Sequence, residues 1–179
     1  MIRFREDIFT NDMLELIRQA STELPEDVEY ALKNALAQED STSTANMVLS
    51  SILENVELAR KTSRPLCQDT GLPAFYISYP QSVSTITIRK CLEKAVVEAT
   101  KKGFLRPNAM SSLTGYNGGD NIGKYIPHIE FTEWFEDEIH VKCMLKGGGC
   151  ENVSTQYSIP TPGLKAGRDM DGVFTCVMD

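Results

Sequence analysis

The chain has 179 residues, of which 41% are hydrophobic and 24% are charged, and these proportions are ordinary for a globular protein that builds its own core. Its formal net charge of −7 argues against a surface that binds nucleic acid or an anionic membrane. No apolar run approaches the roughly 20 residues that cross a bilayer, and the first residues lack the apolar stretch of a signal peptide, so we expect a cytoplasmic protein.

Apolar residues spaced three and four positions apart predict three helices in the first third of the chain and two more later. The helices are expected to begin near Asn11 or Asp12, at Pro25–Asp27, at Ser43 or Thr44, near Ser84 and at Asp169. The third should end near Lys61–Ser63, because Pro65 disfavours helical backbone at the residue before it. Gly103 predicts the end of the fourth, because glycine readily adopts the left-handed conformation that ends many helices.

Three strands are expected, one between the third and fourth helices and two after the fourth. Their approximate ranges are Ala74–Tyr79, Pro127–Trp134 and Glu138–Leu145. In the last of these, apolar and polar residues alternate, as in a strand with one buried face. The sequence therefore predicts a single α+β domain over residues 1–179, in which N-terminal helices are followed by a mixed or antiparallel sheet with helices packed on it.

The residues Cys67-Gln68-Asp69-Thr70-Gly71 follow the third helix in a polar loop. Two interpretations of Cys67 stay open: a small buried hydrophobic residue, the common fate of an unpaired cysteine, or a nucleophile or metal ligand. Asp69 is either a turn-forming residue or a proton acceptor beside that thiolate.

Two further segments carry groups that suit an anion. Arg106 opens a long loop, residues 106–125, that is rich in Asn and Gly, and its guanidinium could clamp a carboxylate or lie on the surface with no ligand. Glycines 147–149 close the last strand, where bare backbone could direct N–H groups at an anion or simply form a flexible turn. A thiolate, an acid, an arginine and a glycine turn together suggest lyase chemistry on a small carboxylate.

The other four cysteines are Cys91, Cys143, Cys150 and Cys176. Because no C-x-x-C pair occurs and no secretory signal is visible, neither a self-contained zinc site nor disulfides are expected. Cys91, Cys143 and Cys176 fall at apolar positions and are expected to pack in the core, whereas Cys150 is ambiguous. His128 and His140 have no metal-ligand spacing and are interpreted as structural.

These motifs together resemble the iron–sulfur hydro-lyases, which comprise the class I fumarate hydratases and the alpha subunit of L(+)-tartrate dehydratase. The segments that carry the resemblance are Cys67–Gly71, Leu105–Ala109, Thr114–Gly123 and Lys146–Asn152, in that order. The resemblance covers most of the chain, from the N-terminal helices to Leu164–Asp179.

The resemblance implies a 4Fe-4S cluster that is held by three cysteines and has one iron open to substrate. Cys67 matches the first ligand, and the other two are expected outside this chain. The polypeptide is therefore expected to be the N-terminal part of an alpha subunit or of a single-chain enzyme, truncated before those ligands and inactive alone. Gln68, Asp69, Arg106 and the backbone at Gly149 are implied to line the substrate site, with Asp69 as the catalytic residue that activates a threonine base from the missing part.

The activity that the resemblance implies is the reversible hydration of fumarate to L-malate, a step of the tricarboxylic acid cycle. Dehydration of L(+)-tartrate is the alternative, and the cysteine directly after the glycines, Cys150, favours it. The implied partners are a small dicarboxylate and a beta subunit or C-terminal domain, in a homo- or hetero-oligomer without nucleic acid or membrane. An alternative of another class is a non-catalytic module that binds a dicarboxylate or a metal.

Overall fold

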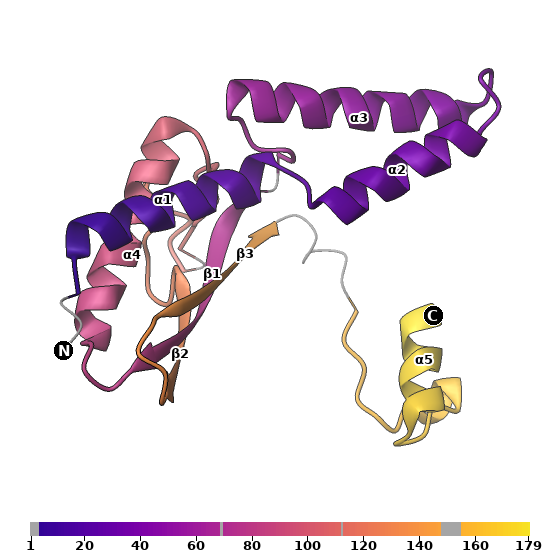
Figure 1. Ribbon diagram of the computed structural model, residues 1–179. Coiled ribbons are helices and arrows are strands. Elements are labelled where there is room, and N and C mark those ends of the chain that lie inside the picture. The colour runs from indigo at the N-terminus through magenta and orange to yellow at the C-terminus, as the bar shows by residue number, and fades with distance from the viewer. Residues whose placement is uncertain (1–3, 69, 112, 148–154) are drawn as a thin grey trace. The chain divides into compact units, whose positions relative to one another are not determined.

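The computed structural model describes residues 4–68, 70–111, 113–147 and 155–179, and it divides into two compact units, Met1–Gly148 and Gly149–Asp179. The elements of the first unit are α1 (Glu6–Thr22), α2 (Glu26–Gln38), α3 (Thr44–Thr62), β1 (Thr70–Pro80), α4 (Thr85–Lys102), β2 (His128–Trp134) and β3 (His140–Gly147) (Figure 1). The second unit contains a short 3₁₀ helix, η2 (Pro162–Leu164), and α5 (Met170–Met178). The predicted α+β class is confirmed.

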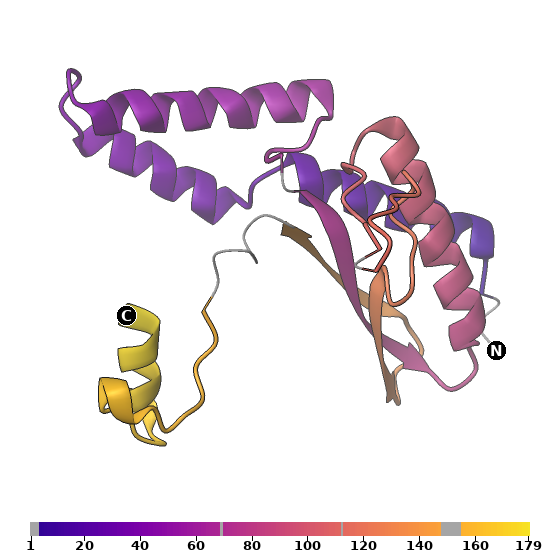
Figure 2. The ribbon, with the colours of Figure 1, turned by 180° about the vertical axis from the view of Figure 1, so that it is seen from behind.

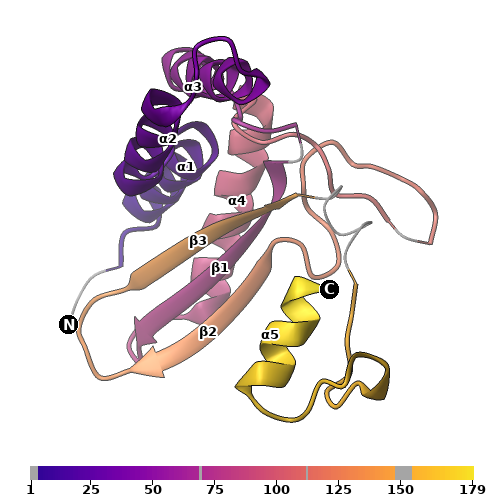
Figure 3. The ribbon, with the colours of Figure 1, turned by 90° about the vertical axis from the view of Figure 1, so that its right-hand side faces the viewer.

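The three strands form one mixed sheet with the order β2-β1-β3 (Figure 3). β1 pairs parallel with β2 and antiparallel with β3. A parallel pair needs a crossover connection, which α4 and the loop after it supply between β1 and β2. β2 and β3 follow one another closely in the chain, yet they lie on opposite sides of β1 and do not pair with each other.

The register of the strands brings three distant parts of the chain to one end of the sheet. Thr70, at the start of β1, lies opposite Gly147, at the end of β3. Ala74 lies opposite His128, at the start of β2. The loops before β1, before β2 and after β3 therefore all leave from the same end.

One face of the sheet is covered by α1 and α4 (Figures 2 and 3), and the core lies between these layers. The residues that are at most 2% exposed there include Ile17 from α1, Phe75 and Ile77 from β1, and Leu92 and Val96 from α4. Burial of such side chains contributes roughly 1.5–3 kcal/mol each to the free energy of unfolding. This core fixes the strand ends that carry the candidate site.

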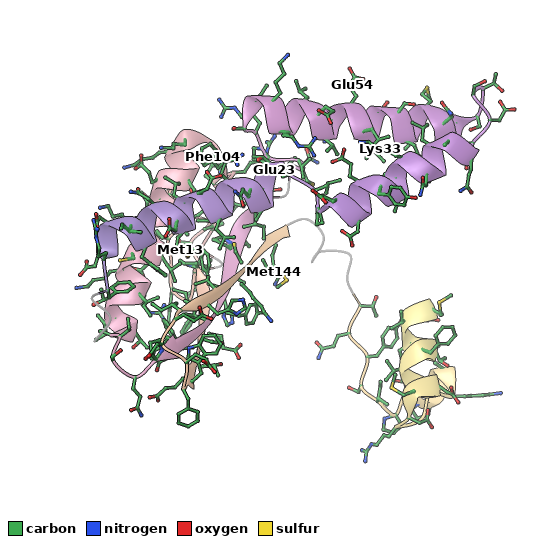
Figure 4. All side chains as sticks on the ribbon, viewed as in Figure 1. Met13, Glu23, Lys33, Glu54, Phe104 and Met144 are labelled. Atoms are coloured by element: carbon green, nitrogen blue, oxygen red, sulfur yellow. The ribbon has the colours of Figure 1, made fainter. Side chains whose placement is uncertain are left out.

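The other face of the sheet is largely polar. Tyr76, in the centre, lies opposite Glu130 on β2 and Lys142 on β3. Two methionines labelled in Figure 4 illustrate the difference between the faces. Met13 of α1 is buried in the core on the helix side, whereas Met144 of β3 is 46% exposed. The alternation predicted for the last strand is thus confirmed, with its apolar residues toward the helices.

Helix starts were predicted correctly where a side chain caps them. Ser43 Oγ accepts a hydrogen bond from Asn46 N, and Asp169 Oδ1 accepts one from Gly172 N, so both satisfy an N–H of a first turn. The predicted start of the first helix near Asn11 or Asp12 is wrong, because α1 begins at Glu6. No side chain caps α1, and its first turn is marked only by two acidic residues that favour the positive end of the helix dipole.

α2 and α3 pack against each other as a hairpin (Figure 1). No residue of α2 is buried, and on α3 only Val56 and Ala59 are buried. An ion-pair cluster joins the two helices, because Glu29 contacts Lys33 at 2.6 Å and Arg60 of α3 at 2.5 Å.

The described part of the second unit is small. Gly172, at the start of α5, packs on Gly167, and a Cβ at Gly172 would lie 2.0 Å from the Gly167 carbonyl oxygen. Tyr157 donates a hydrogen bond to Asp179 at the other end of α5. Across the described residues of both units, no helix has the length and apolar content needed to cross a membrane.

Candidate functional site

Cys67 lies in the turn that leads from α3 into β1. The residue before it is fixed at both peptide groups, because Leu66 N donates to Ser21 O at the end of α1 and Leu66 O accepts from Asn55 Nδ2 of α3. Cys67 O accepts from Thr70 N at 3.1 Å, which closes the turn. The Cys67 side chain is exposed, as is that of Gln68. The interpretation of Cys67 as a buried hydrophobic residue is therefore wrong.

The segment that carries Arg106 lies directly beside this turn. Arg106 N donates to Thr70 O at 3.0 Å, and its side chain is exposed. Leu105, which precedes it, is 2% exposed and joins the core. A buried anchor thus holds the backbone while the guanidinium stays available to a ligand.

Gly71 allows the two segments to approach so closely. A Cβ at this position would lie 2.7 Å from Arg106 O and 2.6 Å from Asn108 Nδ2, closer than non-bonded atoms come. Glycine has no such atom, so the backbone of the loop can pass over the start of β1.

The end of β3 completes the arrangement. Gly147 lies opposite Thr70, and Lys146, which is exposed, lies opposite Leu72. The chain therefore brings together the Cys67 turn, the Arg106 segment and the first of the three glycines, as predicted. Asp69 and Gly149 lie outside the described residues, so their predicted roles stay predictions, and the same holds for Cys150.

Sequence reasoning missed one residue that organises this region. Asn121 is 1% exposed, and its side-chain amide contacts the backbone around Arg106 from within the long loop. Its conformation is left-handed, with φ at 59°, which Asn tolerates better than most residues. The Asn-rich composition of the loop was the available signal, but it did not single out this position.

Arg64 adds a second guanidinium close to the same end of the sheet. A Cβ at Gly103, where α4 ends with φ at 76°, would lie 2.0 Å from Arg64 Nη1, so the guanidinium packs over this glycine. The predicted end of α4 at Gly103 is confirmed. Local basic groups of this kind are what a dicarboxylate needs in a chain with a net charge of −7.

The described cysteines differ in their availability to a metal. Cys91 is 3% exposed within α4, and Cys176 is buried in α5. Burial raises the pKa of the Cys143 thiol to about 12, so this thiol stays protonated at neutral pH. Their interpretation as packing residues is confirmed. Within residues 4–68, 70–111, 113–147 and 155–179, no group of three or more His, Cys, Asp and Glu side chains could hold a metal ion.

An apolar groove of about 560 Å³ runs along α3 and reaches Leu66, next to the Cys67 turn. Its other lining residues are Leu24, Met47, Val48, Ser51, Ile52, Asn55 and Val56. A small dicarboxylate needs charged or hydrogen-bonding partners, which this mostly apolar lining does not offer. The groove therefore offers fewer polar partners for a small anion than the surface between Cys67 and Arg106.

Comparison with known proteins agrees with this geometry. Residues 10–179 match the family described as fumarate hydratase (Fumerase). A protein of Geobacillus stearothermophilus, named "Putative fumarate hydratase class I", is 46% identical over 169 residues, which are 93% of this chain and 33% of that protein.

Two further relatives are named as alpha subunits of L(+)-tartrate dehydratase. The one from Methanocaldococcus jannaschii, "Putative L(+)-tartrate dehydratase subunit alpha", is 37% identical over 86% of this chain and 55% of its own length. The one from Escherichia coli K12 is 30% identical over 73% of this chain and 43% of its own length.

The chain thus spans between about a third and about half of the length of these curated relatives. Its match to the family extends over nearly all of its residues, through the Cys67 turn, the Arg106 segment and the end of β3. The chain belongs to the fumarate hydratase (Fumerase) family.

Proposed function

We propose that this chain is the N-terminal, alpha-type part of an iron–sulfur hydro-lyase that adds water reversibly to fumarate to give L-malate. The observation that carries the proposal is the meeting of three distant segments at one end of the sheet. The exposed Cys67 turn is hydrogen-bonded through Thr70 to the Arg106 segment, and Thr70 is paired with Gly147. Membership of the fumarate hydratase family supports the choice of reaction.

The reaction places a hydrogen on one alkene carbon and a hydroxyl on the other. In the reverse direction a proton leaves a carbon beside a carboxylate, and negative charge develops on that carboxylate in the transition state. Arg106 is suited to hold this carboxylate with two parallel hydrogen bonds from its planar guanidinium. Preorganised donors of this kind stabilise the developing charge, which lowers the barrier to proton transfer.

Gln68 and Asp69 directly follow Cys67 in the chain. The Gln68 side chain is exposed beside Cys67 and can donate an amide hydrogen bond to substrate oxygens. We assign Asp69 to the orientation of the base that moves the proton, and the backbone N–H groups at Gly149 to a second carboxylate contact, as the family resemblance implies.

Cys67 fits one ligand position of a 4Fe-4S cluster, because its thiol is exposed and the residue before it is fixed by hydrogen bonds at both peptide groups. When bound, the cluster would supply an open iron that acts as a Lewis acid toward the substrate hydroxyl. We assign the remaining ligands and the proton-transferring base to a further domain or a beta subunit, since two relatives are named as alpha subunits and are longer than this chain. Assembly as a homo- or hetero-oligomer, a role in the tricarboxylic acid cycle and a cytoplasmic location remain part of the proposal.

Anaerobic reconstitution of the complete protein with iron and sulfide tests the proposal directly. The expected results are the broad visible absorbance of a 4Fe-4S cluster and the interconversion of malate and fumarate. The interconversion is measured by the ultraviolet absorbance of fumarate. Cluster absorbance without turnover of either substrate would instead support the non-catalytic binding module. If neither cluster absorbance nor turnover is observed, the hydro-lyase proposal is refuted.

L(+)-tartrate is the second candidate substrate, because two of the relatives carry that name. Parallel assays with malate and tartrate at equal concentration discriminate the two. A kcat/KM for tartrate that exceeds the value for malate would assign the chain to the tartrate enzymes.

Replacement of single cysteines tests the assignment of the metal ligand. We expect Cys67→Ser to abolish retention of the cluster in the complete protein, because a serine oxygen is a poorer ligand for this iron than a thiolate. Cys91→Ser is the matched control, since Cys91 is buried in α4 away from the exposed turn. Iron content and visible absorbance after gel filtration measure the outcome. Equal loss of iron in both variants would show that Cys67 is the wrong ligand.

A further inference from the structure

We propose that Asn121 is the positioning residue that holds Arg106 in place for the substrate carboxylate. The proposal rests on the proposed function, because it assumes that Arg106 binds a carboxylate. It adds a residue that touches neither substrate nor metal and acts only through the backbone of the Arg106 segment.

The side chain of Asn121 uses all of its hydrogen-bonding capacity. Its Oδ1 accepts from Asn108 N at 2.9 Å and from Ala109 N at 3.0 Å. Its Nδ2 donates to Arg106 O at 2.7 Å and to Thr100 Oγ1 at 3.1 Å. An amide has two donors and two acceptor positions, so every one of them has a partner.

This set of bonds connects α4 to the loop. Thr100 lies in the last turns of α4 and also donates to Val96 O within the helix at 2.8 Å. Through Asn121, the loop backbone is therefore tied to an element that is packed in the core. In a site that is 1% exposed, each bond is protected from competition by water.

The consequence for Arg106 is that both of its peptide groups are held. Its N–H donates to Thr70 O of β1, and its carbonyl accepts from Asn121 Nδ2 at 2.7 Å and from Asn108 N at 2.8 Å. The backbone is fixed, while the side chain remains exposed and can meet a ligand. Fixing the backbone in advance lowers the entropy that is lost when the guanidinium binds, which improves affinity without a new contact.

Asparagine is required here for two reasons. Aspartate has nearly the same shape but no N–H groups, so it would leave Arg106 O and Thr100 Oγ1 facing a carboxylate oxygen. The left-handed backbone at φ 59° also disfavours β-branched or bulky replacements. Asn121→Asp is therefore the sharpest variant, because it keeps size and backbone preference while it replaces both N–H donors with an acceptor oxygen of an ionisable carboxyl group.

The test is a double-mutant cycle in the complete, cluster-loaded protein with Asn121→Asp, Arg106→Ala and both together. Asn121→Asp should lower kcat/KM about 10- to 100-fold, mostly through a higher KM, because the guanidinium is displaced from the substrate. In the Arg106→Ala background the same change should have little further effect on KM, because no guanidinium remains to be positioned. Val83→Ala is the control for lost stability, since Val83 is buried beyond the other end of β1. It should leave KM unchanged.

Amide hydrogen exchange of the cluster-free protein gives a second readout that does not depend on activity. Asn121→Gly, which removes the side chain and tolerates the left-handed backbone, should speed exchange at the Asn108 and Ala109 amides, because both lose the oxygen that accepts from them. Val83→Ala should not affect these amides selectively. Faster exchange together with a non-additive cycle supports the proposal.

Two results would overturn it, and they have different meanings. If Arg106→Ala raises KM but Asn121→Asp does not, or if the two effects are additive, Asn121 has no positioning role and the proposed function stands. If Arg106→Ala leaves KM unchanged, the proposed carboxylate contact itself fails, and the positioning role fails with it.

Discussion

Gly71 lies where the Arg106–Asn108 segment crosses the start of β1, and its missing side chain leaves the space for that crossing. The two atoms nearest to a hypothetical Cβ belong to Asn108 and to the Arg106 carbonyl, and the carbonyl cannot rotate away as a flexible side chain could. At this position the identity of one residue decides whether two parts of the candidate site can be in contact.

Gly71→Ala should therefore destabilise the protein by about 1–3 kcal/mol, the usual effect of forcing an extra carbon into a packed site. It should also raise KM, because the Arg106 segment must move away from β1. Urea unfolding and steady-state kinetics of the complete protein measure both effects. Gly163→Ala is the control, since a Cβ there would meet nothing within 4 Å. A Gly71→Ala protein with unchanged stability would contradict this account of the crossing.

Residue types in the site could be predicted from the sequence, but most of their contacts could not. The thiol at Cys67 and the guanidinium at Arg106 stand out as polar chemistry in loops, and both side chains are exposed in the structure. Asn121 could not be identified in this way, because its role depends on hydrogen bonds to residues 12 to 21 positions away. Nothing in the local sequence specifies which loop asparagine will be buried.

At the scale of elements, an ion-pair cluster joins the two helices of the α2–α3 hairpin, in which few residues are buried. Glu29 is paired with Lys33 on its own helix and with Arg60 on α3. The hydrogen bonds from Lys33 and then Arg60 lower the pKa of Glu29 below its usual value of 4.5. Figure 4 labels Lys33 on α2 and Glu54 on α3, and Glu54 forms no ion pair with any residue that the structure describes.

Glu29→Gln should weaken the hairpin in a pH-dependent way. A lowered pKa in the folded state stabilises the protein at pH values above the unfolded pKa, and this stabilisation is lost as the pH falls through the folded pKa. The variant should therefore have a lower urea midpoint than the wild type at pH 7, and the difference should vanish in strong acid and shrink at high salt. Glu54→Gln is the matched control and should show no such pH dependence. A difference at pH 7 that persisted in strong acid would mean that Glu29 acts through packing instead.

Elements with local signals were predicted best. Capped helix starts at Ser43 and Asp169 and the glycine end of α4 at Gly103 are encoded within a few residues, so pattern reasoning identified them. The start of α1 was missed by five or six residues because no capping side chain marks it. The three strands were located within a few residues, the last of them from its alternation, and their ends shifted because pairing is non-local.

At the scale of the molecule, the core of the first unit holds the strand ends in register. Phe75 is 0% exposed at the centre of β1, whereas Phe135, in the turn between β2 and β3, is fully exposed. Phe75→Ala should destabilise the protein by about 3–5 kcal/mol. Phe135→Ala, the same substitution on the surface, should change stability by less than about 0.5 kcal/mol. Urea unfolding monitored by circular dichroism measures both, and similar effects would contradict the assignment of the core.

The sheet order could not be predicted from the sequence. Two consecutive strands joined by a short acidic turn are equally compatible with a hairpin and with the observed order, in which β1 lies between them. The mixed character was anticipated, but the central place of β1 depends on which strands bury the most apolar area against α1 and α4. The prediction of a single domain remains untested, and the described residues fall into two compact units.

The antiparallel pairing of β1 with β3 has a consequence for how this protein can be re-engineered. Thr70 and Gly147 are neighbours because the pairing of β1 with β3 places them opposite each other. The length of the chain between the two strands does not set their distance directly. Extra residues grafted into the turn at 135–139 would leave the neighbours in place, because the alignment is set elsewhere. A single residue removed from within β3 would instead shift the glycines along the sheet and exchange its inner and outer side chains.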